Sequence, residues 1–257
     1  MKRWIALLAT LAILLAACGD DDGAPATSTS GAAPTTTGAA PTTVPGSDNS
    51  ITPAPAGPQE VAFPTPDGLT LEGTLFAAGS TWVILAHMFP ADMTSWFEFA
   101  AVLQAEGYTA LAYNNRGYGE SDAAAGPLDV GADALGALAF ARSGGAARVF
   151  FFGASMNGAA ALFLAAESDL AGIASLSGVP AWDNTPGLER AAGVTEPALF
   201  VAAEDDGDSV ATAQAMADAV GGDSEVVAYP TGGHGTDVFG DNPGLTALLL
   251  DFVRAHS

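Results

Sequence analysis

Residues 149–164 constrain this chain more than any other segment, because they join two kinds of apolar sequence through one serine. Residues 149–152 are apolar and mostly aromatic, which predicts a short buried strand. The Ala- and Leu-rich run that follows predicts a helix, so Ser155 lies on the sharp turn between strand and helix. Such turns follow the pattern G-x-S-x-G, in which a strained backbone holds the serine hydroxyl above the edge of the sheet. Gly153 matches the first glycine of this pattern, whereas Asn157 stands at the second.

The chemistry of Ser155 depends on what accompanies it, because a Gly-x-Ser tripeptide alone often only caps a helix. A serine that attacks acyl groups needs a histidine base, a carboxylate that orients the base, and backbone donors for the oxyanion. After a turn of this type the chain order is Ser, then Asp or Glu, then His. His234 lies in a Gly-rich segment after the last predicted strand, and we interpret it as the general base. The competing histidines are His87, which follows an earlier strand, and His256, in the C-terminal tail.

An acidic loop supplies the candidate carboxylates. It follows the predicted strand 197–203, and open α/β sheets bind their ligands at the carboxyl ends of such strands. The spacing alone leaves four candidates open, which are Glu204, Asp205, Asp206 and Asp208.

The N-terminus predicts export and a lipid anchor. Two basic residues precede an apolar run, residues 4–17, that is short for a bilayer span and suits the core of a signal peptide. Ala16-Ala17-Cys18 resembles the lipobox of bacterial lipoproteins, in which the cysteine is diacylglycerol-modified and becomes the mature N-terminus. The alternative is a plain secretory signal with an incidental cysteine. Cys18 is the only cysteine, so a disulfide within the chain is excluded. We therefore expect an extracytoplasmic protein, anchored to the bacterial cell membrane by lipid alone.

Composition divides the remainder into a tether and one folded domain. Residues 19–58 are almost entirely Gly, Ala, Pro, Ser, Thr and Asp, a composition that predicts a disordered, semi-extended tether. Residues 59–257 have the length of a single α/β domain. Without the signal peptide, five basic residues remain against 29 acidic ones, so the surface repels nucleic acid and anionic lipid.

Strand and helix patterns alternate along this domain and predict a mostly parallel sheet with right-handed crossovers. The segment 179–196, between two predicted strands, is too short for a lid domain. The expected strands are 61–63, 69–76, 82–86, 108–113, 148–152, 171–178, 197–203 and 225–229, and the expected helices are 95–106, 129–142, 156–166, 209–220 and 245–255.

Four motifs in this order resemble those of the α/β-hydrolases, and the resemblance covers residues 59–257. The motifs are His87-Met88-Phe89-Pro90 in place of H-G-x-P, residues 116–121 like R-G-x-G-x-S, the turn at Ser155, and Gly232-Gly233-His234. The resemblance implies the α/β-hydrolase fold, with helices on both faces of the sheet and a minimal lid. It also implies a serine hydrolase that cleaves a carboxylic ester or related acyl bond of a small substrate through an acyl-enzyme.

The resemblance also implies roles for individual residues. The family spacing G-x-x-D, represented here by residues 203–206, favours Asp206 as the residue that orients His234. The oxyanion donors are the backbone N–H groups of Met156 and Phe89, and His87 has a structural role. The sequence departs from the family at Met88 and Asn157, where glycine is usual.

A catalytically silent α/β-hydrolase-like lipoprotein, used for binding, is the alternative function, and the two departures favour it. No metal-ligand spacing, phosphate-binding glycine loop or dinucleotide fingerprint has a convincing context, so we expect no metal and no cofactor. We expect a monomer whose partner is a small acyl substrate and which binds no nucleic acid.

Overall fold

The computed structural model describes residues 57–257. Cys18, the predicted signal peptide 1–18 and the predicted tether up to residue 56 lie outside the described residues. No helix among residues 57–257 is long and apolar enough to cross a membrane.

The described residues form one eight-stranded sheet with the order β1-β2-β4-β3-β5-β6-β7-β8. β2 pairs antiparallel with both of its neighbours, β1 and β4. The remaining pairs, which join β4, β3, β5, β6, β7 and β8 in that order, are all parallel. The carboxyl ends of β3, β5, β7 and β8 therefore meet at one edge of the sheet. The strands are β1 (Gln59–Pro64), β2 (Thr70–Phe76), β3 (Thr81–Ala86), β4 (Thr109–Tyr113), β5 (Arg148–Ala154), β6 (Gly172–Leu176), β7 (Ala198–Ala203) and β8 (Ser224–Tyr229).

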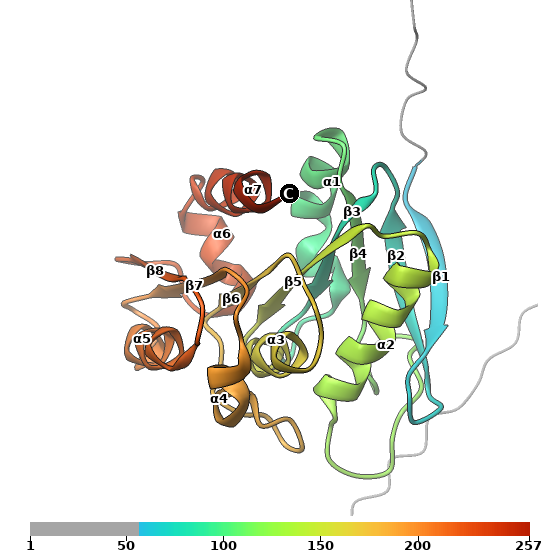
Figure 1. Ribbon diagram of the computed structural model, residues 1–257, viewed down its shortest axis with the longest axis horizontal. Coiled ribbons are helices and arrows are strands. Elements are labelled where there is room, and N and C mark those ends of the chain that lie inside the picture. The colour runs from blue at the N-terminus through green and yellow to red at the C-terminus, as the bar shows by residue number, and fades with distance from the viewer. Residues whose placement is uncertain (1–56) are drawn as a thin grey trace, which may run out of the picture. The chain divides into compact units, whose positions relative to one another are not determined.

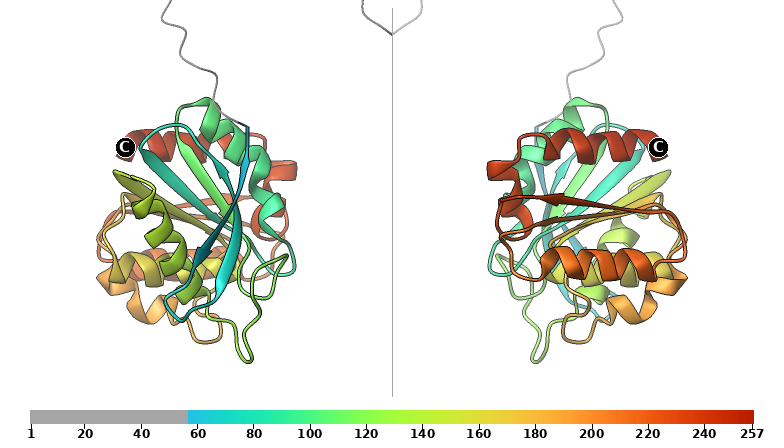
Figure 2. Two further views of the ribbon diagram at one scale, coloured as in Figure 1. Left: turned by 90° about the vertical axis from the view of Figure 1, so that its right-hand side faces the viewer. Right: turned by 90° about the vertical axis from the view of Figure 1, so that its left-hand side faces the viewer.

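Helices cover both faces of this sheet (Figures 1 and 2). One face packs against α2, α3 and α5, and the other against α1 and α7, which gives two apolar layers. The α-helices are α1 (Phe97–Ala105), α2 (Val130–Ser143), α3 (Met156–Glu167), α4 (Gly187–Arg190), α5 (Ser209–Ala219), α6 (Val238–Asp241) and α7 (Leu245–His256). Residues 57–257 also contain the short 3-10 helices η1 (Met93–Trp96), η2 (Ala191–Gly193) and η3 (Gly235–Asp237).

The predicted fold class is confirmed, with small shifts at the ends of the elements. The predicted hairpin is β1 and β2, joined by a turn in which Gly68 has a φ of 90°. The helix predicted at 95–106 is divided, because η1 forms its first turn and α1 the rest. Between β6 and β7 only α4 and η2 occur, so the lid is minimal, as expected.

Candidate active site

Ser155 lies between the buried strand β5 and the start of α3. Its φ is 49° and its ψ is −111°, a conformation that L residues rarely adopt. The turn is also tight, since a Cβ atom on Gly153 would lie 2.0 Å from the carbonyl oxygen of Asn157. The sequence pattern predicts an exposed hydroxyl, but Ser155 is only 5% exposed, because the His234 ring lies against it. The strained turn therefore directs the serine toward a histidine rather than toward open solvent.

His234 lies in a loop whose shape depends on glycine. Gly232, Gly233 and Gly235 all have positive φ values, of 146°, 68° and 59°. The loop brings His234 Nε2 to 2.7 Å from Ser155 Oγ and His234 Nδ1 to 2.7 Å from Asp206 Oδ2. The Asp206 carboxylate can only accept, so a neutral His234 ring that bonds it carries its proton on Nδ1, which leaves Nε2 as the acceptor for the Ser155 hydroxyl.

Of the four acidic candidates, Asp206 is the one whose carboxylate contacts His234. Its Oδ2 atom also accepts a hydrogen bond from the hydroxyl of Ser209, at 2.5 Å. Asp205 has a different place, because its carboxylate accepts the N–H groups of Gly232, at 3.2 Å, and Gly233, at 3.1 Å. Asp205 thus connects the loop that follows β7 to the loop that carries His234. The sequence reasoning missed the contacts of both Ser209 and Asp205.

The candidate oxyanion donors lie at the start of α3 and in the loop after β3. Met156 is the first residue of α3, so its N–H has no carbonyl within the helix to which it could donate. Phe89 follows β3 and is 57% exposed. Met88 is buried and has no positive φ. It packs against the histidine loop, since a Cβ on Gly235 would lie 2.5 Å from Met88 Sδ. The residue that replaces the usual glycine is therefore accommodated.

His87, the first competing histidine, is buried, and its ring is hydrogen-bonded to backbone groups and not to Ser155. Its Nε2 accepts a hydrogen bond from the Asn115 N–H at 3.1 Å, and its Nδ1 lies 2.9 Å from the carbonyl oxygen of Met88. Burial lowers the pKa of His87 and favours the neutral ring. His256, the second competitor, ends α7 with its ring centroid 4.9 Å from that of Phe252.

Asn157 is fully buried in the first turn of α3. Its Nδ2 donates hydrogen bonds to the carbonyl oxygen of His87, at 2.6 Å, and to Oδ1 of Asn115, at 2.7 Å. The close backbone approach expected at this position occurs one residue later. A Cβ on Gly158 would lie 2.5 Å from the Cα of Gly178. Gly158 thus allows the helix to pack tightly, and position 157 can carry a side chain.

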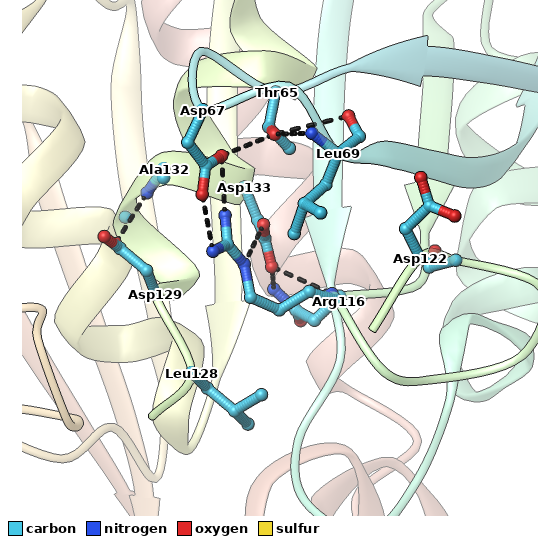
Figure 3. Close-up of polar contacts among 12 residues, drawn as sticks. Thr65, Asp67, Leu69, Arg116, Asp122, Leu128, Asp129, Ala132 and Asp133 are labelled. Carbon is cyan, nitrogen blue, oxygen red and sulfur yellow. Dashed lines mark hydrogen bonds and ion pairs between the residues drawn. The ribbon is translucent and has the colours of Figure 1, made fainter. Parts of the chain in front are cut away.

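Arg116 and Asp133 form a buried ion pair, which Asp67 extends (Figure 3). Arg116 Nε donates to Asp133 Oδ1 at 2.7 Å, and the Arg116 side chain is 3% exposed and that of Asp133 0%. The two terminal nitrogens of the guanidinium, Nη1 and Nη2, donate to Oδ2 and Oδ1 of Asp67, at 2.8 and 3.1 Å. Burial raises the pKa of the Asp133 carboxyl, against the opposing effect of hydrogen bonds from Arg116 and Asn115. The hydrogen bond from Arg116 lowers the pKa of Asp67.

A groove of about 300 Å³ lies between the segment that follows β6 and helix α5, and neither Ser155 nor His234 lines it. The backbone N–H of Val179 donates to the carbonyl of Ser155 at 3.1 Å, and the next residue, Pro180, lines the groove. Asp208 lines it too. The other lining residues are Leu188, Ala211, Thr212, Ala215 and Met216. Residues 57–257 contain no group of three or more His, Cys, Asp or Glu side chains that could hold a metal ion.

Comparison with known proteins identifies the fold. A family model described as "alpha/beta hydrolase fold" matches residues 81–192, which is less than half of the chain. An esterase of Pyrococcus furiosus is similar with a TM-score of 0.65 at 15% identity, over 78% of this chain and 91% of its own. A thermophilic esterase of Thermogutta terrifontis has a TM-score of 0.65 at 18% identity, and the match covers 77% of this chain and 100% of the esterase. An enol-lactonase of Burkholderia xenovorans has a TM-score of 0.63 at 18% identity, and the match covers 76% of this chain and 100% of the lactonase. None of the curated proteins matches. The described domain therefore has the α/β-hydrolase fold.

Proposed function

We propose that this protein is a serine hydrolase that cleaves a carboxylic ester or a related acyl bond of a small substrate. The observation that carries the proposal is the continuous relay from Ser155 through His234 to Asp206, with both hydrogen bonds at 2.7 Å. The similarity to esterases and a lactonase supports a hydrolase in general terms. The relay supports acyl chemistry, because it is the arrangement that a serine nucleophile requires.

Each residue of the relay has one step in this mechanism. Ser155 Oγ attacks the acyl carbon while His234 Nε2 takes its proton, and Asp206 stabilises the imidazolium that forms. The N–H groups of Met156 and Phe89 stabilise the oxyanion of the tetrahedral intermediate. His234 then gives the proton to the leaving group, and the acyl group remains on Ser155. Water, activated by His234, repeats these steps and releases the acid.

A short lid favours small acyl groups. Trp182 and Leu188, the large apolar residues of the segment between β6 and β7, pack against the domain core. Each methylene contributes about 0.8 kcal/mol only where it is buried. With p-nitrophenyl esters of increasing length, we expect kcat/KM to level off or fall beyond roughly six carbons, because little apolar surface can enclose a longer chain. A steady rise through C16 would contradict this substrate class.

Labelling with a fluorophosphonate tests the proposed chemistry directly. The probe reacts with an activated serine, so we expect the wild-type protein to be modified at Ser155 and Ser155→Ala to remain unmodified. Absence of labelling in folded wild-type protein would instead favour a silent scaffold used for binding. Asn157 and Met88 are the residues that favour this second function, and both are accommodated in the fold.

Lipid anchoring through Cys18 is a further part of the proposal and rests on the sequence. Metabolic labelling with a palmitate analogue should mark the wild-type protein. Cys18→Ser should abolish the label, and the variant should either be released from the membrane in soluble form or remain an uncleaved precursor. An unlabelled wild type would contradict the anchor without affecting the proposed chemistry.

A further inference from the structure

Asn157 is buried beside the candidate nucleophile, at a position where the sequence pattern has a glycine. Both N–H bonds of its amide are used, one to the carbonyl oxygen of His87 and one to Oδ1 of Asn115. Its own Oδ1 has no hydrogen-bond partner among residues 57–257. Because burying an unpaired amide oxygen is unfavourable, we attribute the function of this side chain to the two hydrogen bonds that it donates.

The segment that Asn157 holds carries the candidate oxyanion donor. The Asn115 N–H donates to His87 Nε2, so the proton of the His87 ring is on Nδ1 and is donated to the carbonyl oxygen of Met88. The Met88–Phe89 peptide is trans, so this carbonyl and the Phe89 N–H point in opposite directions. The His87 ring therefore fixes the direction of the Phe89 N–H. A hydrogen bond to the carbonyl also polarises the peptide and strengthens its N–H as a donor.

Asn115 is itself held firmly by the buried ion pair. Its Nδ2 donates to Asp133 Oδ2 at 3.2 Å, and the same oxygen accepts the Arg116 N–H at 2.9 Å. Asn157 thus connects the start of α3 to two segments that follow β3 and β4. A glycine at position 157 would leave the His87 carbonyl and the Asn115 side-chain oxygen buried without their donor, and residues 87–89 would be free to shift.

We propose that Asn157 is a positioning residue for the oxyanion site: it holds the His87 carbonyl and Asn115, and through them the His87 ring that orients the peptide of the Phe89 N–H. The inference rests on the serine-hydrolase function proposed above. Oxyanion donors act mainly in the transition state, because they are aimed at the place where negative charge develops. Loss of the Asn157 amide therefore lowers kcat and leaves KM nearly unchanged.

Kinetics of Asn157→Gly and Asn157→Asp in the full-length, detergent-solubilised protein test this role. Asn157→Asp keeps the shape of the side chain but replaces the donating amide group, and it serves if the glycine variant does not fold. With p-nitrophenyl acetate we expect kcat to fall about 10- to 100-fold and KM to stay within about threefold. A boronic acid, which forms a tetrahedral adduct with serine, should bind more weakly by a factor similar to the fall in kcat/KM.

Thr109→Val is the matched control. Thr109 is buried at the start of β4, at the opposite end of the sheet, and its hydroxyl bonds the Ala78 N–H at 2.9 Å and the Gly79 carbonyl at 2.8 Å. This variant should lower the free energy of unfolding and leave kcat unchanged. If the Asn157 variants reduce kcat no more than Thr109→Val does, or raise KM alone, the positioning role is wrong. If folded wild-type protein is not labelled at Ser155, the proposed function itself fails, and this inference fails with it.

Discussion

The two sides of Ser155 are built differently. On the side of β7 and β8, the candidate base and its carboxylate lie on loops, with His234 38% and Asp206 18% exposed at the side chain. On the side of β3 and β4, polar groups are buried and interlocked. They are His87, Asn115, Arg116, Asp133 and Asn157. Groups that exchange protons with a substrate must be reachable, whereas groups that only hold the backbone can be buried.

This difference predicts two kinds of mutational effect. Changes on the side of β7 and β8 should impair chemistry with little effect on folding. Changes on the side of β3 and β4 should lower stability, because each buried polar group that loses its partner carries a large penalty. The predictions below probe this distinction, from the largest expected effect to the smallest.

Ser155→Ala should give the largest effect. Removing the nucleophile should lower the rate of ester hydrolysis by on the order of 10⁶, because the remaining groups cannot form an acyl-enzyme. The free energy of unfolding should stay the same or rise slightly, since a strained turn contributes nothing to packing through its hydroxyl. Esterase assays and urea unfolding of the same preparation measure both. Residual activity above a few per cent would place the nucleophile elsewhere.

Asp206→Asn should lower kcat by about 10⁴, because an amide at this position favours the wrong tautomer of His234. Glu204→Gln is the matched control, since Glu204 lies in the same acidic loop and its side chain is exposed. Steady-state kinetics on both variants provide the measurement. Equal losses in the two variants would show that loop charge matters and that orientation of His234 does not.

Arg116→Met tests the buried side. The substitution leaves Asp133 without its cation, so we expect the free energy of unfolding to fall by about 3–5 kcal/mol. Arg254→Met breaks exposed ion pairs with Glu106 and Asp251 and should change the free energy of unfolding far less, because solvent screens such pairs. Urea unfolding curves give both values. Similar losses for the two variants would contradict the contrast between buried and exposed polar contacts.

The pH dependence of stability should show the smallest effect. Because burial lowers the pKa of His87, the unfolded chain takes up its proton first, as the pH falls below about 6.5. The stability that the neutral ring contributes is present above that pH and is lost on acidification, with a slope of at most about 1.4 kcal/mol per pH unit. The difference in unfolding free energy between wild type and His87→Gln should therefore shrink between pH 7 and pH 5.

Local patterns were enough to predict most of the fold. Aromatic runs, Ala-rich runs and glycines mark nearly every strand and helix, because burial and chain reversal act over a few residues. Ser155 and His234 could be chosen for the same reason, since each lies directly after a predicted strand. The order of the strands and the pairing of Asn157 with His87 depend on contacts between residues that are far apart in the chain. No local pattern encodes such contacts.

Two residues show where sequence reasoning ended. Met88 and Asn157 stand where glycine is usual, and from the sequence alone they favour the alternative of a catalytically silent protein used for binding. In the structure Met88 packs against Gly235. The amide of Asn157 donates hydrogen bonds to His87 and Asn115, and the close backbone approach is made by Gly158, to Gly178. A departure from a motif can thus be compensated by a neighbour in space, which is visible only once the chain is folded.

The loop of the candidate base has a consequence for protein engineering. Three of its residues are glycines with positive φ, so almost any substitution there would strain the backbone and displace His234. Directed evolution of a new substrate preference would therefore gain little from randomising this loop. The more productive position is Met88, whose flexible side chain touches the loop through Gly235. Libraries at this one position would adjust the placement of the base from outside the loop, without altering its backbone.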